Sequence, residues 1–390
     1  LTPRVMQDMG EDRGGIVVSP RGRGTSTWYV GRGHADFLEV WDDVFANVAV
    51  DPDRVYVSGH SMGGFGSYLL SILYPDRFAA ALPVAGPVTQ GAWTGADVPG
   101  CDGLRSGDYS PCYIATNGSD PRVQHTRRLL ENLRNVPIGI FHGAADELVP
   151  VSGVTRQVER LAELGYRHRY YLFPTYEHYT HPVADQWAEG VRYMDSFRRD
   201  RNPGVVSYIR DMPFERTVEI GPNVRANQDI GLNFDFDRAY WMSELTPADP
   251  VNGVARFWGR THAMFPKDLL NAPVPEAGGP ASLGQTGPYT MSGIRWESLP
   301  RELSQEPENA FVSQTWGASA VRLDTTRMGL DTNSKMTGFI YTDRPLEIRL
   351  DGAWTEVPEV TWSSIPVGVE LRPDGVVVLR VSGTTTVQLG

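Results

Sequence analysis

This 390-residue chain has little cysteine, no long apolar run and no excess of positive charge. Each of these features excludes a class of protein. With two cysteines the fold does not rest on a disulfide framework, and the chain is long enough to form cores without one. No apolar run approaches the roughly 20 residues that span a bilayer, which excludes a transmembrane protein. Because 36 basic residues face 47 acidic ones, we expect neither nucleic acid nor an anionic membrane surface as a partner.

Recognisable binding motifs for cofactors are absent as well. Neither Gly31-Arg32-Gly33 nor Gly63-Gly64-Phe65-Gly66 is followed by the acidic residue that a dinucleotide-binding loop needs. The sequence has no Walker motif and no cluster of metal ligands at a credible spacing. We therefore expect no cofactor and no metal ion.

The two cysteines, Cys101 and Cys112, lie in a stretch rich in Gly, Asp, Ser and Pro, without the spacing of metal ligands. A disulfide between them predicts an oxidising compartment, and hence a secreted or extracytoplasmic protein. Two free thiols in a cytosolic protein are the alternative. The chain begins at Leu1 with no initiator Met and no signal-peptide core, which predicts a processed, trimmed or cleaved product.

The pattern of apolar and polar residues changes near residues 200–204. Before this boundary, short apolar runs alternate with helical patterns, which predicts an α/β domain over 1–202 with a mostly parallel sheet covered on both sides. Strands are expected at 15–19, 54–58, 79–84, 138–142 and 169–173, and helices at 36–48, 63–74, 123–134, 151–164 and 183–198.

From residue 203 to 390, short alternating segments are separated by turn residues, which predicts an all-β, sandwich-like domain. The Pro- and Gly-rich segment 271–293 is expected to be a long surface loop. Strands are expected at 205–209, 239–242, 338–341, 346–350, 376–381 and 385–389.

The strongest chemical signal is Gly59-His60-Ser61-Met62-Gly63-Gly64, between an expected strand and an expected helix. In that context Gly-x-Ser-x-Gly predicts a nucleophile elbow, in which Ser61 occupies a strained turn and small neighbours let strand and helix approach closely. The backbone N–H of Met62 and the helix N-terminus would stabilise an oxyanion there, and His60 could line the site. An inert serine in a glycine-rich turn is the alternative.

An acid and a base for this serine should follow it in the order Ser, acid, His. Asp146 leaves the end of one expected strand on a small-residue turn, with Glu147 as its neighbouring rival. An Asx turn or a helix cap is the alternative role of Asp146. His178 follows the next expected strand and is the expected base, whereas His181 precedes a proline and is expected to cap or pack. His142 is expected to be a core histidine beside the acid turn.

These motifs resemble the α/β-hydrolase superfamily over residues 14–200, about half of the chain. Besides the elbow, the resemblance rests on His142–Pro150 and Pro174–His178. The segment Tyr74–Ala80 looks like secreted esterases and polyester depolymerases, and is also similar to the catalytic domain of prolyl-oligopeptidase-type peptidases.

The resemblance implies Ser61 as nucleophile, Asp146 as acid, His178 as base and the Met62 N–H as one oxyanion donor. The family's second donor lies on a loop after its third strand and has no match here. Because 15–19 would be the family's fourth strand, strands one to three should precede Leu1. Three explanations for the missing donor loop are open. They are a cleaved N-terminal piece that stays bound, a partial chain, and a rearranged fold in which another loop donates.

The segment Arg21–Tyr29 is expected at the same sheet edge, where it could supply backbone donors or substrate contacts, with Trp28 and Tyr29 as candidates. A flexible loop rich in Arg and Gly is the alternative. The segment 87–120 lies where this architecture often places a lid. Its aromatic residues could line an acyl or aromatic pocket or pack on the surface. They are Trp93, Tyr109 and Tyr113.

Together these features predict a serine hydrolase that cleaves a small-molecule or polymeric carboxylic ester through an acyl-enzyme. A prolyl-oligopeptidase-like peptidase acting on peptides is the first alternative. The second is a non-catalytic binding protein on a hydrolase scaffold, whose C-terminal domain holds a polymer or a partner.

Overall fold

The chain divides into two compact units, each built from segments that are separated in sequence. A computed structural model describes residues 9–10, 14–24, 27–88, 126–149, 151–184, 186–215, 234, 236–264, 271–282, 287–298 and 306–390. Unit 1 comprises Leu1–Arg199, Phe214–Phe234 and Pro273–Arg295. Unit 2 comprises Asp200–Pro213, Asp235–Ala272 and Trp296–Gly390. The chain thus leaves the first unit at Arg199 and returns to it twice.

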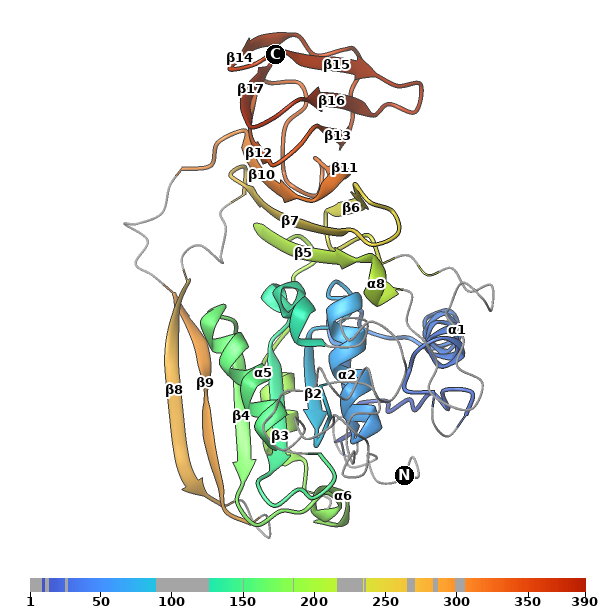
Figure 1. Cartoon of the computed structure of the whole chain (residues 1–390), viewed down its shortest axis with the longest axis vertical. Helices are drawn as coiled ribbons and strands as arrows, with labels where there is room; N and C mark the ends of the chain where they lie inside the picture. Colours follow the sequence, from blue (N-terminus) through green and yellow to red (C-terminus); the bar gives the residue numbers. More distant parts are fainter. Residues whose placement is uncertain are drawn as a thin grey trace. The chain divides into compact units, whose positions relative to one another are not determined.

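A mixed sheet organises unit 1, with the strand order β1-β2-β3-β4-β9-β8 (Figure 1). The first four strands pair in parallel, and β9 pairs antiparallel with β4. Both β2 and β3 are buried along their whole length, as expected for central strands of a parallel sheet. The strands are β1 (Tyr56–His60), β2 (Ala80–Val84), β3 (Ile138–Gly143), β4 (His168–Phe173), β8 (Asn271–Ala281) and β9 (Tyr289–Ser298).

Helical segments connect the parallel strands, because a parallel pair needs a crossover connection. Helix α2 packs against β1 and β2, and α7 packs against β2 and β3. The apolar sequence of α2 is buried from Gly64 to its last residue, which is why this helix shows no polar face. The helices are α1 (Arg32–Asn47), α2 (Met62–Leu73), the 3₁₀ helix η2 (Thr126–Asn135), α5 (Val151–Glu163), α6 (Thr180–Ala184) and α7 (Ala188–Asp195).

Three expected elements of unit 1 differ from the structure. Residues 15–19 form no strand, and Ile16 is 65% exposed, because an apolar run becomes a strand only where a neighbouring strand pairs with it. The expected surface loop 271–293 contains β8 and β9 instead, since proline is tolerated in an edge strand such as β8. The expected helix 183–198 is broken into α6 and α7, which leaves Val183 82% exposed while Trp187 is buried.

Unit 2 contains two sheets, with orders β14-β17-β12-β10-β7-β5 and β15-β16-β13-β11-β6. One cluster of buried side chains draws on both sheets, including Tyr208 and Phe257 from the first and Leu323 and Ile348 from the second. The expected strand 239–242 is only a bridge between Ala239 and Met242, where β6 begins. The strands are β5 (Val205–Asp211), β6 (Met242–Pro247), β7 (Val254–Thr261), β10 (Ala310–Trp316), β11 (Ala318–Asp324), β12 (Met336–Thr342), β13 (Leu346–Asp351), β14 (Val360–Ser363), β15 (Val367–Leu371), β16 (Val377–Val381) and β17 (Thr385–Leu389), and a short helix α8 (Met212–Glu215) follows β5.

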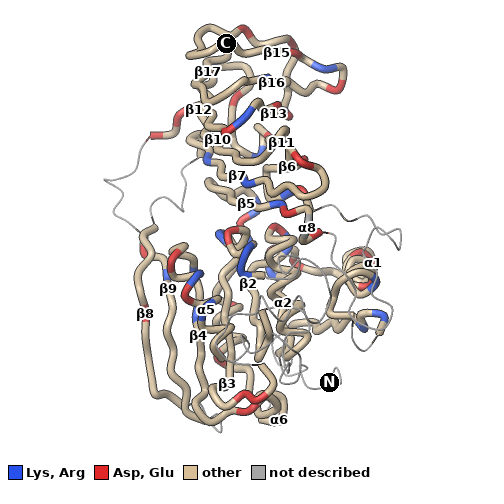
Figure 2. The backbone as a smooth tube through the Cα atoms, in the orientation of Figure 1, with Lys and Arg blue, Asp and Glu red and all other residues tan. Residues whose placement is uncertain are grey.

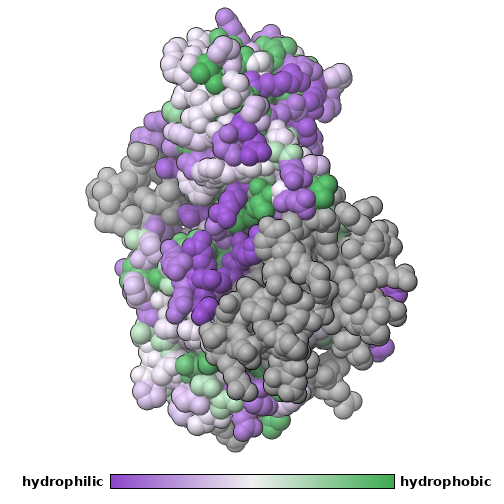
Figure 3. All heavy atoms as spheres, viewed as in Figure 1, coloured by the Kyte–Doolittle hydropathy of each residue, from purple (hydrophilic) through white to green (hydrophobic). Residues whose placement is uncertain are grey.

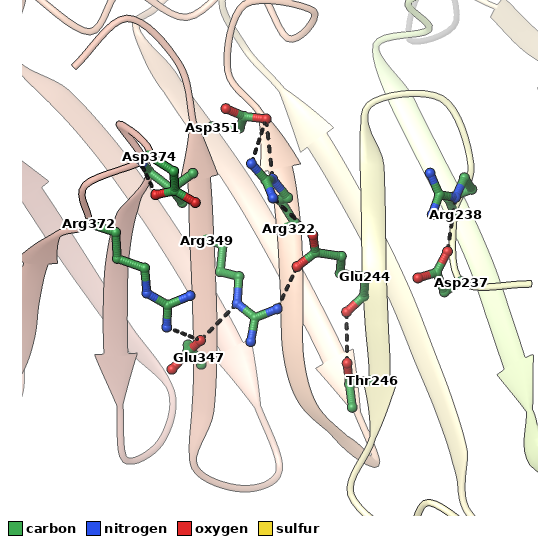
Figure 4. Close-up of polar contacts among 11 residues, drawn as sticks. Asp237, Arg238, Glu244, Thr246, Arg322, Glu347, Arg349, Asp351, Arg372 and Asp374 are labelled. Carbon is green, nitrogen blue, oxygen red and sulfur yellow. Dashed lines mark hydrogen bonds and ion pairs between the residues drawn. The ribbon is translucent and has the colours of Figure 1, made fainter. Parts of the chain in front are cut away.

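Side chains of opposite charge contact one another across the second sheet of unit 2 (Figure 4), and Figure 2 marks the charged positions along the chain. In β13 the alternate residues Leu346, Ile348 and Leu350 are buried, so Glu347 and Arg349 face outward. Arg349 bonds Glu347 at 2.8 Å and also contacts Glu244 of β6. Arg322 of β11 reaches Glu244 at 2.9 Å, so the pairs cross neighbouring strands. Hydrophilic side chains accordingly cover much of this unit on the face in Figure 3.

Replacing Arg349 with Met tests whether this charge network stabilises unit 2. The variant loses bonds to two half-buried carboxylates, so we expect the free energy of unfolding to fall by about 1 kcal/mol, and by less at high salt. Urea denaturation at low and high NaCl measures both effects. Arg344→Met is the matched control, because Arg344 pairs with its own neighbour Asp343. Equal losses in the two variants would contradict a contribution from the network.

Candidate active site

Ser61 occupies the sharp turn between β1 and α2. Its backbone has φ 58° and ψ −117°, a region that residues other than glycine rarely adopt. The Ser61 N–H donates to the Val84 carbonyl at 2.8 Å, and the Phe65 N–H donates to the Ser61 carbonyl at 3.0 Å. The strained turn is therefore held by the neighbouring strand and by the first turn of the helix.

Close approach of strand and helix explains the glycines of this turn. A Cβ added to Gly59 would lie 2.5 Å from the carbonyl oxygen of Gly63, which is backbone and has little room to move. Met62 is the first residue of α2, so its N–H has no acceptor within the helix. The turn thus presents the Ser61 side chain beside a backbone N–H that has no acceptor within the helix, at an N-terminus where the helix dipole favours negative charge.

A chain of hydrogen bonds joins Ser61 to His178 and Asp146. His178 Nε2 lies 2.8 Å from Ser61 Oγ, and His178 Nδ1 lies 2.9 Å from Asp146 Oδ2. Because a carboxylate only accepts, the proton of the neutral imidazole is on Nδ1. Nε2 then carries the lone pair that accepts the Ser61 hydroxyl proton. The structure brings together the three residues that the sequence predicted.

The carboxylate of Asp146 is held in its ionised form. Burial opposes ionisation, but hydrogen bonds from His178 and from the Val149 N–H outweigh it, and the pKa of Asp146 lies below its usual value. Asp146 Oδ1 accepts the N–H groups of Leu148 at 3.0 Å and of Val149 at 2.7 Å. The Asx turn considered from the sequence is therefore present, and it leaves Oδ2 directed at the imidazole.

Backbone contacts join the turn that carries Asp146 to the turn that carries His178. The Ala144 N–H donates to the Phe173 carbonyl at 2.9 Å, and the Ala145 N–H donates to the Tyr176 carbonyl at 3.2 Å. Gly143 lies directly against the second turn, where a Cβ would fall 2.0 Å from the Tyr176 carbonyl oxygen. The relative placement of acid and base is thus set by main-chain atoms.

Three further histidines are buried around this chain of hydrogen bonds. His60 Nε2 lies 2.8 Å from the His178 carbonyl oxygen, and His142 Nε2 lies 2.9 Å from the Val149 carbonyl oxygen. Burial lowers the pKa of His60 to about 4 and that of His181 to about 3, and it also lowers the pKa of His142. These imidazoles are therefore neutral at neutral pH, so they add no positive charge beside His178.

Trp28 and Tyr29 differ in their relation to the nucleophile turn. Trp28 is 6% exposed and its ring meets the Phe65 ring edge-on, with centroids 5.7 Å apart, so it packs in the core. Tyr29 is half-buried, and its hydroxyl lies 3.9 Å from where a Cβ on Gly63 would be. Burial and the nearby Asp36 raise the pKa of Tyr29, which keeps its hydroxyl a hydrogen-bond donor.

Sequence reasoning missed the role of Glu147, which it treated only as a rival acid. Glu147 Oε2 accepts the backbone N–H of His178 at 3.1 Å, whereas the imidazole bonds Asp146. The one available signal was its position directly after the acid. Other predicted residues lie outside those that the structure describes. They are Trp93, Cys101, Tyr109, Cys112 and Tyr113.

Two features are absent from the residues that the structure describes. No group of three or more His, Cys, Asp or Glu side chains is placed to hold a metal ion there. In the same part of the chain, no helix combines the length and the apolar character needed to cross a membrane.

Gly143→Ala tests the contact between the acid and base turns. The new Cβ would collide with the Tyr176 carbonyl, so we expect the free energy of unfolding to fall by about 1–3 kcal/mol. Thermal and urea denaturation measure this loss. In the control Gly15→Ala, the nearest heavy atom would be 3.4 Å from the Cβ, so little change is expected. A Gly143→Ala variant as stable as this control would refute the close contact.

Comparison with known proteins matches the N-terminal half of the chain. Residues 5–198 match the model of the prolyl oligopeptidase family. Poly(3-hydroxyalkanoate) depolymerase C of Paucimonas lemoignei is 31% identical over 143 residues, which are 33% of this chain and 30% of that protein. The S-formylglutathione hydrolase of Mus musculus is 29% identical over 162 residues, covering 39% of this chain and 53% of that protein.

This chain therefore spans about half the length, or less, of these curated relatives. A solved structure of a fluorophosphonate-binding serine hydrolase of Staphylococcus aureus, with substrate bound, matches with 19% identity and a TM-score of 0.34, covering 43% of this chain and 67% of that one. The family match covers the elbow sequence and the turns that carry Asp146 and His178. The chain belongs to the α/β-hydrolase superfamily.

Proposed function

We propose that this protein is a serine hydrolase that cleaves a carboxylic ester through an acyl-enzyme. The observation that carries the proposal is the hydrogen-bond chain from Asp146 through His178 to Ser61, with separations of 2.9 and 2.8 Å. A serine hydroxyl becomes a nucleophile when a base takes its proton and an acid holds that base in the right tautomer.

In the proposed mechanism His178 Nε2 takes the hydroxyl proton as Ser61 Oγ attacks the ester carbonyl carbon. Asp146 stabilises the imidazolium that forms. His178 then gives the proton to the departing alkoxide, which leaves an acyl group on Ser61. Water attacks this acyl group with His178 again as base, and the acid product leaves with Ser61 restored.

Negative charge on the substrate oxygen needs preorganised donors during both steps. We propose the Met62 N–H as one donor, because it has no acceptor within α2. Tyr29 is proposed to contact the substrate, since its hydroxyl lies near the first turn of α2. Trp28 would act more remotely, by packing behind this turn. Neither the mechanism nor these contacts need a metal or a cofactor.

The preference for esters over peptides is supported by chemistry and by the relatives. An alkoxide leaves more readily than an amine. The relatives' names describe a poly(3-hydroxyalkanoate) depolymerase, an S-formylglutathione hydrolase and a bifunctional acetylxylan esterase/xylanase. A small or polymeric ester is therefore the proposed substrate. The match of residues 5–198 to the prolyl oligopeptidase family favours a peptidase as the second candidate.

The setting of this activity is also a proposal. We propose a secreted or extracytoplasmic protein with a Cys101–Cys112 disulfide and no nucleic-acid or membrane partner, from the composition alone. We further propose that the two sheets of unit 2 form a β-sandwich, because one buried cluster draws on both.

A fluorophosphonate probe tests whether the protein is a serine hydrolase. We expect covalent labelling of the wild-type protein and none of Ser61→Ala, because the probe reacts with an activated serine. Gel fluorescence and intact mass measure the adduct. Labelling of Ser61→Ala at the wild-type rate, or no labelling of the folded wild type, would refute the proposal and favour a binding protein.

Asp146→Asn tests the role of the acid. Asparagine keeps the shape but no longer stabilises the imidazolium or enforces the tautomer, so we expect kcat for an ester to fall about 10⁴-fold. Stopped assays with p-nitrophenyl esters measure the loss. The matched control Glu177→Gln removes an exposed carboxylate one residue from His178 and should stay near wild type. Similar rates for the two variants would exclude Asp146 as the acid.

Matched ester and amide substrates distinguish the two candidate reactions. We compare p-nitrophenyl acyl esters with Xaa-Pro p-nitroanilides and expect kcat/KM for the esters to be larger, since p-nitrophenoxide is a better leaving group than p-nitroaniline. Both series release a chromophore, so absorbance reports both. Higher kcat/KM for the amides would make the protein a peptidase and would overturn the ester assignment.

A further inference from the structure

We propose that His60 is a positioning residue, which with Glu147 clamps the backbone of His178 so that the imidazole points at Ser61. This inference rests on the proposed function and adds a role that the triad itself does not include. The clamp is defined as two hydrogen bonds on one residue: His60 Nε2 to the His178 carbonyl at 2.8 Å, and Glu147 Oε2 from the His178 N–H at 3.1 Å.

The clamp ties together the three loops that carry the proposed catalytic residues. His60 directly precedes the nucleophile at the end of β1, and Glu147 directly follows the acid after β3. Both hold the residue that provides the base, in the turn after β4. A shift of the His178 turn would therefore break a bond to each of the other two loops.

The imidazole of His60 is suited to this role by its protonation state. A carbonyl oxygen only accepts, so Nε2 of His60 carries the proton and donates it. Burial keeps the ring neutral at neutral pH, so the donor adds no charge that would disfavour protonation of His178 during the reaction. The two rings lie with centroids 4.8 Å apart, which fixes His178 by packing as well as by its backbone.

The two halves of the clamp differ in environment. His60 is 5% exposed, so its hydrogen bond does not compete with water, whereas Glu147 is exposed. Removing the buried half should therefore matter more than removing the exposed half. Small displacements of a catalytic base have large effects, because proton transfer depends on its distance and angle to the nucleophile.

The test compares two variants of His60 that differ in the donor alone. His60→Leu removes the donor and keeps the volume, and His60→Gln keeps an N–H donor at a similar reach. For p-nitrophenyl ester hydrolysis we expect kcat of His60→Leu to fall about 10- to 100-fold with KM nearly unchanged. His60→Gln should recover most of kcat, and Glu147→Ala should lose only a few-fold.

His181→Leu is the matched control, because it also replaces a buried neutral histidine near His178. It lies against the rings of Phe173 and Tyr176 and has no place in the clamp. We expect its kcat to stay near wild type. Equal kcat losses in His60→Leu and His181→Leu, or no rescue by His60→Gln, would overturn the clamp and leave His60 a packing residue.

A second readout does not depend on turnover. The Nδ1 proton between His178 and Asp146 should give a downfield proton NMR signal, which His60→Leu is expected to shift or broaden and His181→Leu to leave in place. An unchanged signal in folded His60→Leu would overturn the clamp even if the wild type proved inactive. Absence of labelling with an intact signal would instead refute the proposed hydrolase and leave the clamp standing.

Discussion

The hydrogen-bond chain through the His178 imidazole is the interaction on which the account of this protein depends. It requires three loop ends to meet within hydrogen-bonding distance, and the parallel order β1-β2-β3-β4 provides this. Parallel strands have their carboxyl ends at the same edge, so the residues after β1, β3 and β4 are neighbours there. Ser61, Asp146 and His178 follow these three strands.

Main-chain contacts then fix the positions of these three turns relative to one another. The positive φ of Ser61 turns the chain sharply enough for its side chain to stand between strand and helix. The hydrogen bonds from Ala144 and Ala145 place the acid turn on the base turn, and Gly143 leaves no room between them. Side chains therefore complete a site whose frame is backbone, which makes its position insensitive to rotamer changes.

Much of the site could be predicted from the sequence because its motifs are local. The small residues at fixed positions in Gly59–Gly64 indicate the nucleophile elbow. The strand ends before Asp146 and His178 are recognised in the sequence as apolar runs followed by turn residues. The identity of the acid was also accessible, because the shorter side chain follows the turn directly. The bonds of Glu147 and His60 to the His178 backbone were not accessible, since a side chain that bonds a distant main-chain group leaves no motif in the sequence.

The errors in the predicted fold have a common cause. A local sequence pattern does not show which segments pair or pack with one another. Residues 15–19 have the composition of a strand but lie exposed, and 271–293 has the composition of a loop but pairs with β4 through β9. The sequence shows one helical pattern over 183–198, but the structure breaks it between α6 and α7. Val183 therefore lies exposed and not on a buried helix face. The alternation of β12, β13 and β17 was predicted correctly, because one face of each strand is buried and the other is not.

The most direct test of the central claim is to trap the acyl-enzyme itself. Acid quenching during steady-state turnover of a slowly deacylated p-nitrophenyl ester, followed by peptide mapping, locates the acyl group. We expect one acyl mass, on the peptide that contains Ser61. An acyl group on another residue, or turnover without any acylated peptide under conditions where acylation is fast, would contradict it.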